Sequence, residues 1–271
     1  MVDYVFGHSP QELERLMFQA QVLEPFTTRL IEQMGIEPGI RVLDLGCGAG
    51  DVTLLVSERV GPGGAVMGID RSAEAVELAR HRARLAGLTQ ASFVVDEIDT
   101  FTSRQPFDAV IGRYVMVHQA NPVAFLRKAA GFLWPGGVMG LHELLIMEPI
   151  VESHPGVALW DQLGRWFVTA LRAGAPNCEV AGRMIECFAQ AGLPQPGLLC
   201  ERPVGGGAQS PFHHWAAEAI HGVLPHLVRL GVTCEAEADV ASLEHRLRTA
   251  CVQAHAQLLG PTQICAWTQV P

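Results

Sequence analysis

Short apolar runs recur through the middle of the chain, and stretches with helical periodicity separate them. Such runs, bounded by turn residues, are typical of buried strands, whereas apolar residues three or four apart are typical of amphipathic helices. The runs predict strands at 41–45, 65–70, 91–96, 107–112 and 138–143. The stretches between them predict helices at 51–60, 72–87 and 121–133. This alternation predicts a Rossmann-like α/β fold with a doubly wound, parallel sheet.

The residues before this region have a helical pattern of their own. Ser9-Pro10-Gln11-Glu12 has the composition of a capping box, in which serine and glutamate side chains satisfy free N–H groups. We expect a helix to begin near residue 10, to break or restart at Pro25, and to end before Gly35. Residues 1–36 are expected to form a helical lid segment.

The regular alternation ends after residue 148. Two largely helical stretches, 157–173 and 211–259, lie in expected insertions at about 148–180 and 205–260. The remaining elements are a helix at 181–192 and strands at 197–202 and 262–270. We therefore expect residues 37–271 to form one domain, with a sheet of about seven strands and helical lid insertions.

Composition narrows the range of partners. The formal net charge is −9, and an acidic chain repels phosphate backbones, so nucleic acid is not an expected partner. The seven cysteines are odd in number and none are spaced as C-x-x-C, which argues against a disulfide framework and a zinc site. The sequence shows neither a signal peptide nor an apolar run of the roughly 18 residues that a membrane helix needs. A cytoplasmic protein without metal or membrane association is expected.

A glycine-rich turn follows the first predicted strand. Asp44-Leu45-Gly46-Cys47-Gly48-Ala49-Gly50 stands where a parallel sheet binds its ligands and opens a helix. Glycines let the backbone approach a ligand closely, and the helix N-terminus offers free N–H groups to a carboxylate. The dinucleotide fingerprint G-x-G-x-x-G is met at Gly46 and Gly48 but fails at Asp51. Asp44 also disfavours a pyrophosphate and suits a ligand that carries a cation.

Two further acidic positions end the second and third predicted strands. Asp70 is placed to accept both hydroxyls of a ribose. Asp96 and Glu97 are placed to accept an adenine amino group. The structural alternative is that such carboxylates only cap the helices that follow them.

The region 41–143 resembles the class I S-adenosylmethionine-dependent methyltransferases, close to the branch of quinone-biosynthesis and natural-product enzymes. The resemblance rests on five segments: Val42 to Gly50, Gly68-Ile69-Asp70, Val95-Asp96-Glu97, Phe107-Asp108-Ala109-Val110 and Leu133-Trp134-Pro135-Gly136-Gly137. It implies S-adenosylmethionine as the cofactor. The residues that it implies around the cofactor are Gln19, Asp44, Gly46, Cys47, Gly48, Gly50, Asp70, Arg71, Asp96, Glu97, Ile98, Arg113 and His118. Within that set, Asp70 would bind ribose and Arg113 would lie beside the sulfonium.

The sequence indicates the residues around the methyl acceptor less clearly than those around the cofactor. Methyl transfer from a sulfonium mainly needs alignment, although an acceptor hydroxyl can need a general base. The catalytic candidates are His118 after the fourth strand, and His142 with Glu143 at the end of the fifth. The alternative for His118 is packing without proton transfer. Substrate contacts are expected from Tyr4, His8, Gln21 and Trp215, although aromatic residues in the insertions can equally serve as core.

The expected function is methyl transfer from S-adenosylmethionine to an oxygen, nitrogen or carbon of a small organic acceptor, in specialised metabolism. Two alternatives stay open. The bound cofactor can serve a non-methylating reaction such as a cyclisation, or the chain is an NAD-dependent oxidoreductase. The sequence identifies neither the acceptor nor the oligomeric state, so a homodimer also stays open.

Overall fold

The computed structural model describes residues 10–271. Its centre is a seven-stranded sheet with the order β3-β2-β1-β4-β5-β10-β7. The strands are β1 (Arg41–Leu45), β2 (Ala65–Asp70), β3 (Ala91–Val95), β4 (Phe107–Arg113), β5 (Leu133–Leu144), β7 (Gly197–Glu201) and β10 (Gln263–Gln269). The expected Rossmann-like α/β fold is confirmed, including the number of strands in its main sheet.

The first five strands are parallel, and β10 runs antiparallel to both β5 and β7. The strand order reverses between β1 and β4, which lie side by side although β2 and β3 separate them in the sequence. In open α/β sheets, ligands bind outside the carboxyl ends of the strands at such a reversal. The topology therefore places the glycine-rich turn after β1 at the expected ligand-binding position.

Helices cover both faces of this sheet. Alternate residues of a strand point to opposite faces. Val42 packs with α1 and α2, whereas Leu43 belongs to the larger core that includes α4 and α6. The helices around the sheet are α1 (Pro10–Gln33), α2 (Asp51–Val60), α3 (Ala73–Leu85), α4 (Pro122–Ala130) and α6 (Met184–Ala191), with the short 3-10 turns η1 (Met116–His118) and η2 (Val180–Arg183).

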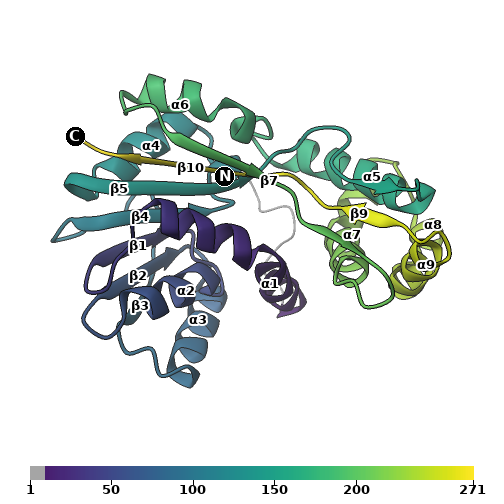
Figure 1. Cartoon of the computed structure of the whole chain (residues 1–271), viewed down its shortest axis with the longest axis horizontal. Coiled ribbons are helices and arrows are strands. Elements are labelled where there is room, and N and C mark those ends of the chain that lie inside the picture. Colours follow the sequence, from purple (N-terminus) through teal and green to yellow (C-terminus); the bar gives the residue numbers. More distant parts are fainter. Residues whose placement is uncertain (1–9) are drawn as a thin grey trace.

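A second group of elements gathers at one end of the sheet (Figure 1). It contains the helices α5 (Ala158–Gly174), α7 (Phe212–Arg229), α8 (Glu235–Ala238) and α9 (Val240–Gln253). A small sheet of the order β6-β9-β8 joins them, formed by β6 (Glu152–His154), β8 (Val204–Gly206) and β9 (Gln257–Leu259). Within residues 10–271, no helix is both long and apolar enough to cross a membrane.

The structure corrects one expectation. Pro25 does not break the first helix, because α1 continues through it as one element of 24 residues and bends along its length (Figure 1). A proline removes one helical hydrogen bond and often kinks a helix, but tertiary packing can hold the helix together. The stretch 211–259 is largely helical, as expected, although it ends in β9, and the three-stranded sheet that contains β9 was not expected.

Candidate active site

A cavity of about 410 Å³ lies at the carboxyl ends of the parallel strands. Its floor comes from the ends of β1, β2 and β4 and from the segment after β3. Its walls come from α1, α5, α7 and the loop after β4. This volume is typical of cofactor and small-molecule sites. The expected cofactor and acceptor sides of the molecule thus open into one space.

The glycine-rich turn forms one edge of the cavity. Gly46, Gly48 and Gly50 all have positive φ, at +67, +52 and +86 degrees. A Cβ at Gly48 would meet nothing within 4 Å, so the backbone there is open toward a ligand. A Cβ at Gly50 would lie 2.9 Å from Cβ of Ala79, and Gly50 does not line the cavity. Gly50 therefore lets α2 start close to α3, whereas Gly48 offers space to a ligand.

Asp44 lies beneath this turn and is 1% exposed. Its Oδ2 accepts a hydrogen bond from Oγ1 of Thr53 at 2.6 Å. Burial raises the pKa of Asp44 to about 7, and the hydrogen bond from Thr53 and the charge of Arg113 oppose that rise. Asp44 therefore stands near its titration point at neutral pH and can balance a ligand's positive charge.

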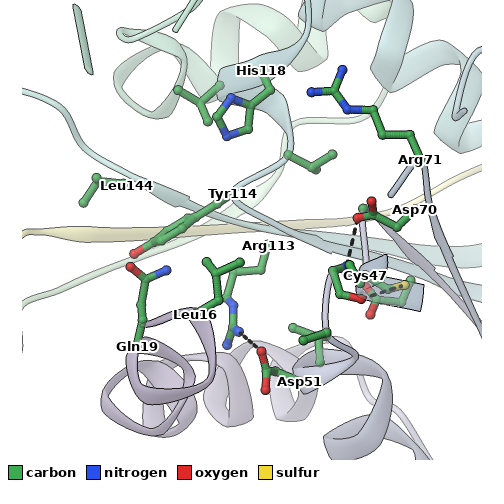
Figure 2. A pocket seen from close by; sticks show the side chains of 18 of the residues that line it. Leu16, Gln19, Cys47, Asp51, Asp70, Arg71, Arg113, Tyr114, His118 and Leu144 are labelled. Carbon is green, nitrogen blue, oxygen red and sulfur yellow. Dashed lines mark hydrogen bonds and ion pairs between the residues drawn. The ribbon is translucent and has the colours of Figure 1, made fainter. Parts of the chain in front are cut away.

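Asp70 faces the turn from the end of β2. Its Oδ2 accepts a hydrogen bond from the N–H of Gly48 at 2.9 Å, and its Oδ1 accepts one from the N–H of Ser72 at 2.9 Å. Each carboxylate oxygen has more than one lone pair, so both retain capacity for a ligand hydroxyl. Figure 2 shows Asp70 beside the turn at Cys47, which also lines the cavity.

The segment after β3 supplies the next part of the lining, with Asp96, Glu97 and Ile98. Oδ1 of Asp96 accepts hydrogen bonds from the N–H of Glu97 and from Oγ1 of Thr100, both at 2.8 Å. These bonds hold the segment in a turn. Asp96 thus holds a turn rather than capping a helix, since the next element after β3 is the strand β4, and Asp96 lines the cavity as well.

Arg113 enters the cavity from the end of β4 (Figure 2). Its Nη2 lies 3.8 Å from Oδ2 of Asp51, and its Nη1 donates to Oγ1 of Thr27 at 3.3 Å. Asp51 also pairs with Arg82 at 2.7 Å. Asp51 thus bridges two arginines at the start of α2, a role that its place in the sequence does not reveal.

His118 lines the cavity on the side opposite α1, near Arg71 (Figure 2). Burial, and to a smaller degree the charge of Arg71, lower the pKa of His118 to about 4. The imidazole is therefore neutral at neutral pH. The neutral ring can accept a proton from a reactant, but it is a weaker base than the ring of an ordinary histidine.

His142 and Glu143 do not line the cavity, and both are 0% exposed. Nε2 of His142 lies 3.0 Å from Oε1 of Gln263, and Nδ1 lies 3.1 Å from Oγ1 of Thr27. Burial lowers the pKa of His142 to about 3. The imidazole is thus a neutral link between β5, β10 and α1.

Glu143 supports the loop after β4. Its Oε1 accepts hydrogen bonds from the N–H groups of Val115 and Met116 at 2.9 and 2.7 Å. Its Oε2 is buried without a hydrogen-bond partner. Burial raises the pKa of Glu143 to about 7. The geometry of both expected catalytic groups on β5 favours support of the cavity wall over contact with a reactant.

Tyr114 is a cavity residue that sequence reasoning missed. It has φ of +56 degrees, which is uncommon for a bulky residue and often marks a functional site. Its hydroxyl donates to Oε1 of Gln263 at 2.6 Å, and Figure 2 shows the ring projecting toward Gln19. Burial raises the pKa of Tyr114 above its ordinary value, so the phenol stays neutral. Its position directly after Arg113 was the only available signal, since sequence does not reveal a left-handed backbone there.

Residues of α1 and α7 meet across the cavity. Gln19 of α1 and Trp215 of α7 both line it, and Nε1 of Trp215 donates to Oε1 of Gln19 at 3.4 Å. Gln21 is exposed and does not line the cavity, because two residues of helix turn it away from the face of Gln19. Tyr4 and His8 lie outside the described residues.

The cavity fits the expected cofactor on three counts. The turn at Gly48 is open, Asp70 retains acceptor capacity, and Asp44 is a buried carboxyl beneath the turn. Asp96 and Glu97 add carboxylates at the next strand end. Among the residues that the structure describes, no group of three or more His, Cys, Asp or Glu side chains could hold a metal ion.

Comparison with known proteins agrees with this geometry. Residues 36–155 match the methyltransferase domain family. A 2-phytyl-1,4-naphtoquinone methyltransferase of Synechococcus elongatus is 30% identical over 209 residues, which cover 72% of this chain and 84% of the relative. Aklanonic acid methyltransferase of a Streptomyces species is 34% identical over 138 residues, which cover 50% of this chain and 61% of the relative.

Solved structures share the fold at low identity. A structure of a Bacillus halodurans protein described as a putative methyltransferase matches with a TM-score of 0.59 at 15% identity, covering 90% of this chain and 98% of that one. The cyclase SpnF matches with a TM-score of 0.54 at 21% identity, covering 91% of this chain and 81% of that one.

Fold and site together define an α/β protein whose cavity, at the strand-order reversal, fits an adenosine-bearing cofactor. The chain belongs to the class I S-adenosylmethionine-dependent methyltransferases, in their small-molecule branch, and S-adenosylmethionine is its cofactor.

Proposed function

We propose that the chain transfers the methyl group of S-adenosylmethionine to an oxygen, nitrogen or carbon of a small organic acceptor, in specialised metabolism. The observation that carries the proposal is the single cavity that joins the strand ends to the aromatic walls of α5 and α7. Relatives named for a phytyl naphthoquinone and for aklanonic acid support an organic acceptor. The acceptor would enter beside Tyr114 and Trp215.

The cofactor's own contribution is an electrophilic methyl group on a sulfonium. The chain's residues then have separate roles in this proposal. Gly46, Cys47 and Gly48 border the methionine moiety, and Asp70 accepts the ribose hydroxyls. Asp44 balances the positive charge of the sulfonium, and Arg113, which is paired with Asp51, lies beside the sulfonium end.

His118 is the proposed proton acceptor where the reacting atom is a hydroxyl. It lines the cavity and is neutral at neutral pH, because burial lowers its pKa to about 4. Tyr114 stays protonated and is held by Gln263, so it can orient an acceptor but not deprotonate it. Proton transfer by a positioned side chain contributes roughly 10²–10⁴ in rate.

The test is incubation with methyl-labelled S-adenosylmethionine and a panel of phenols, amines and enolisable carbonyl compounds. The proposal expects label in an organic product, and His118→Asn should lower kcat for a hydroxyl acceptor at least about 100-fold. Exposed His81→Asn is the control and should leave kcat unchanged. An unlabelled, rearranged product would instead support a cyclisation, and an unaltered kcat in His118→Asn would remove that residue from catalysis.

A further inference from the structure

A smaller cavity of about 50 Å³ lies between α5 and α7, beside the main one. Its walls are entirely apolar and include Ile150, Val151, Leu163, Ala219 and Ile220. Three residues line both cavities: Phe167, Trp215 and Pro261. The small cavity, here called the apolar branch, therefore adjoins the candidate active site at these three residues.

Contacts of two further lining residues, Trp160 and Gly164, hold the walls of the apolar branch in place. The ring of Trp160 stacks on Phe212 with 5.9 Å between centroids and 3° between planes. Nε1 of Trp160 donates to the carbonyl oxygen of Glu152 at 2.9 Å. A Cβ at Gly164 would lie 2.5 Å from Cγ2 of Val151, so α5 already packs tightly on that segment. The branch persists although its surroundings are closely packed.

The size and chemistry of the branch restrict what can fill it. Protein interiors keep few voids larger than a water molecule, and apolar voids stay dry. A cavity of about 150 Å³ accommodates benzene. The apolar branch has about a third of that volume, so it suits an apolar group of two or three carbons.

We propose that the apolar branch binds a short apolar substituent of the methyl acceptor, whose reacting end lies in the main cavity near Tyr114. The proposal rests on the proposed function, since it takes the acceptor to occupy the main cavity. It assigns α5 and α7 a role in choosing the acceptor: they select molecules with a small hydrocarbon branch at one end and a nucleophile at the other.

A ladder of 4-alkylphenols from phenol to 4-hexylphenol tests the proposal. Binding is measured by quenching of tryptophan fluorescence, because Trp160 and Trp215 line the branch. The ladder is run with and without S-adenosylhomocysteine, the demethylated cofactor. Each buried methylene should tighten binding about fourfold until two or three carbons are reached, after which affinity should level off.

Two variants of α7 localise the effect. Ala219→Leu fills the branch and should remove the gain in phenol affinity with each added methylene, while the affinity for S-adenosylhomocysteine stays unchanged. Ile220→Val enlarges the branch and should move the plateau by about one carbon, and this smaller change keeps the test valid if Ala219→Leu does not fold. Val228→Leu, at a 41% exposed position of the same helix, is the matched control and should reproduce the wild-type ladder.

The inference is overturned if no phenol binds, if affinity ignores chain length, or if both variants keep the wild-type increments. These outcomes differ from failure of the proposed function, which is absence of cofactor binding or of labelled product. The affinities of the alkylphenols for cofactor-free protein test the apolar branch whether or not the protein proves to transfer a methyl group.

Discussion

At the scale of single residues, Asp70 carries the clearest expectation. If its carboxylate holds the ribose diol, Asp70→Ala removes two charge-assisted hydrogen bonds, each worth on the order of 1.5–3 kcal/mol. Affinity for S-adenosylhomocysteine should fall at least about tenfold by calorimetry. Asp108→Ala is a control of the same chemistry, because Asp108 accepts the N–H of Arg41 away from the cavity. Unchanged affinity in a folded Asp70→Ala protein would remove Asp70 from the site.

Two glycines of the same turn should behave differently. Gly50→Ala places a Cβ 2.9 Å from Ala79 and 3.1 Å from Phe93 at a φ of +86 degrees, so it should lower the free energy of unfolding by about 2 kcal/mol or more. The new Cβ in Gly48→Ala meets no protein atom within 4 Å. The substitution should therefore lower the free energy of unfolding by only about 1–2 kcal/mol, because its positive φ is unfavourable for alanine. Its main effect should be on cofactor affinity. Denaturant unfolding measures the loss of stability in each variant, and calorimetry measures the loss of cofactor affinity. If both variants lost the same affinity and had the same stability, the two glycines would not have separate roles.

The residues at strand ends were predictable because their chemistry follows from the topology. Asp44, Asp70 and Asp96 were all placed at one edge of the sheet, and all three line the cavity. Tyr114 was missed because its left-handed backbone and its bond to Gln263, 149 positions away, depend on tertiary structure. The orientation of His142 and Glu143 also depends on packing that periodicity does not encode.

At the scale of elements, Glu143 connects β5 to the loop after β4. Its pKa of about 7 in the folded protein exceeds the ordinary value of 4.5. Between these values the folded protein keeps a proton that the unfolded chain has lost, so this group's contribution to stability is full below pH 4.5 and falls as the pH rises to about 7.

Glu143→Gln cannot titrate and should remove this dependence. Its free energy of unfolding, measured relative to wild type, should rise on the order of 3 kcal/mol between pH 4.5 and 7 and then stay level. Glu58→Gln, the same substitution at an exposed position of α2, is the matched control. A flat difference for Glu143→Gln would show that burial does not hold its proton.

The main sheet and its helices were predictable, and the elements over its end were only partly so. Strands such as 41–45 and helices such as 51–60 agree with the structure because local periodicity specifies them. β6, β8 and β9 have only three residues each and owe their existence to pairing between distant segments. Pro25 was read as a break because local propensity cannot register the packing of α1 on β5 and β10.

At the scale of the whole molecule, one cavity joins parts that are far apart in the sequence. Its lining runs from Glu12 of α1 to Pro261 beside β10. A ligand bound there should stabilise the native state as a whole. S-adenosylhomocysteine at about 100 times its Kd should add roughly 2.7 kcal/mol, which raises Tm by about 5–10 °C. Asp70→Ala should show a smaller shift at the same concentration, and an equal shift in both would place the ligand elsewhere.

The central claim is that this cavity binds S-adenosylmethionine and not a dinucleotide. Isothermal titration calorimetry with S-adenosylmethionine, S-adenosylhomocysteine and NAD tests it most directly. The account predicts binding of both sulfur nucleosides with Kd in the micromolar range, on the order of −8 kcal/mol, and no heat with NAD. Heat with NAD and none with either sulfur nucleoside would contradict the account.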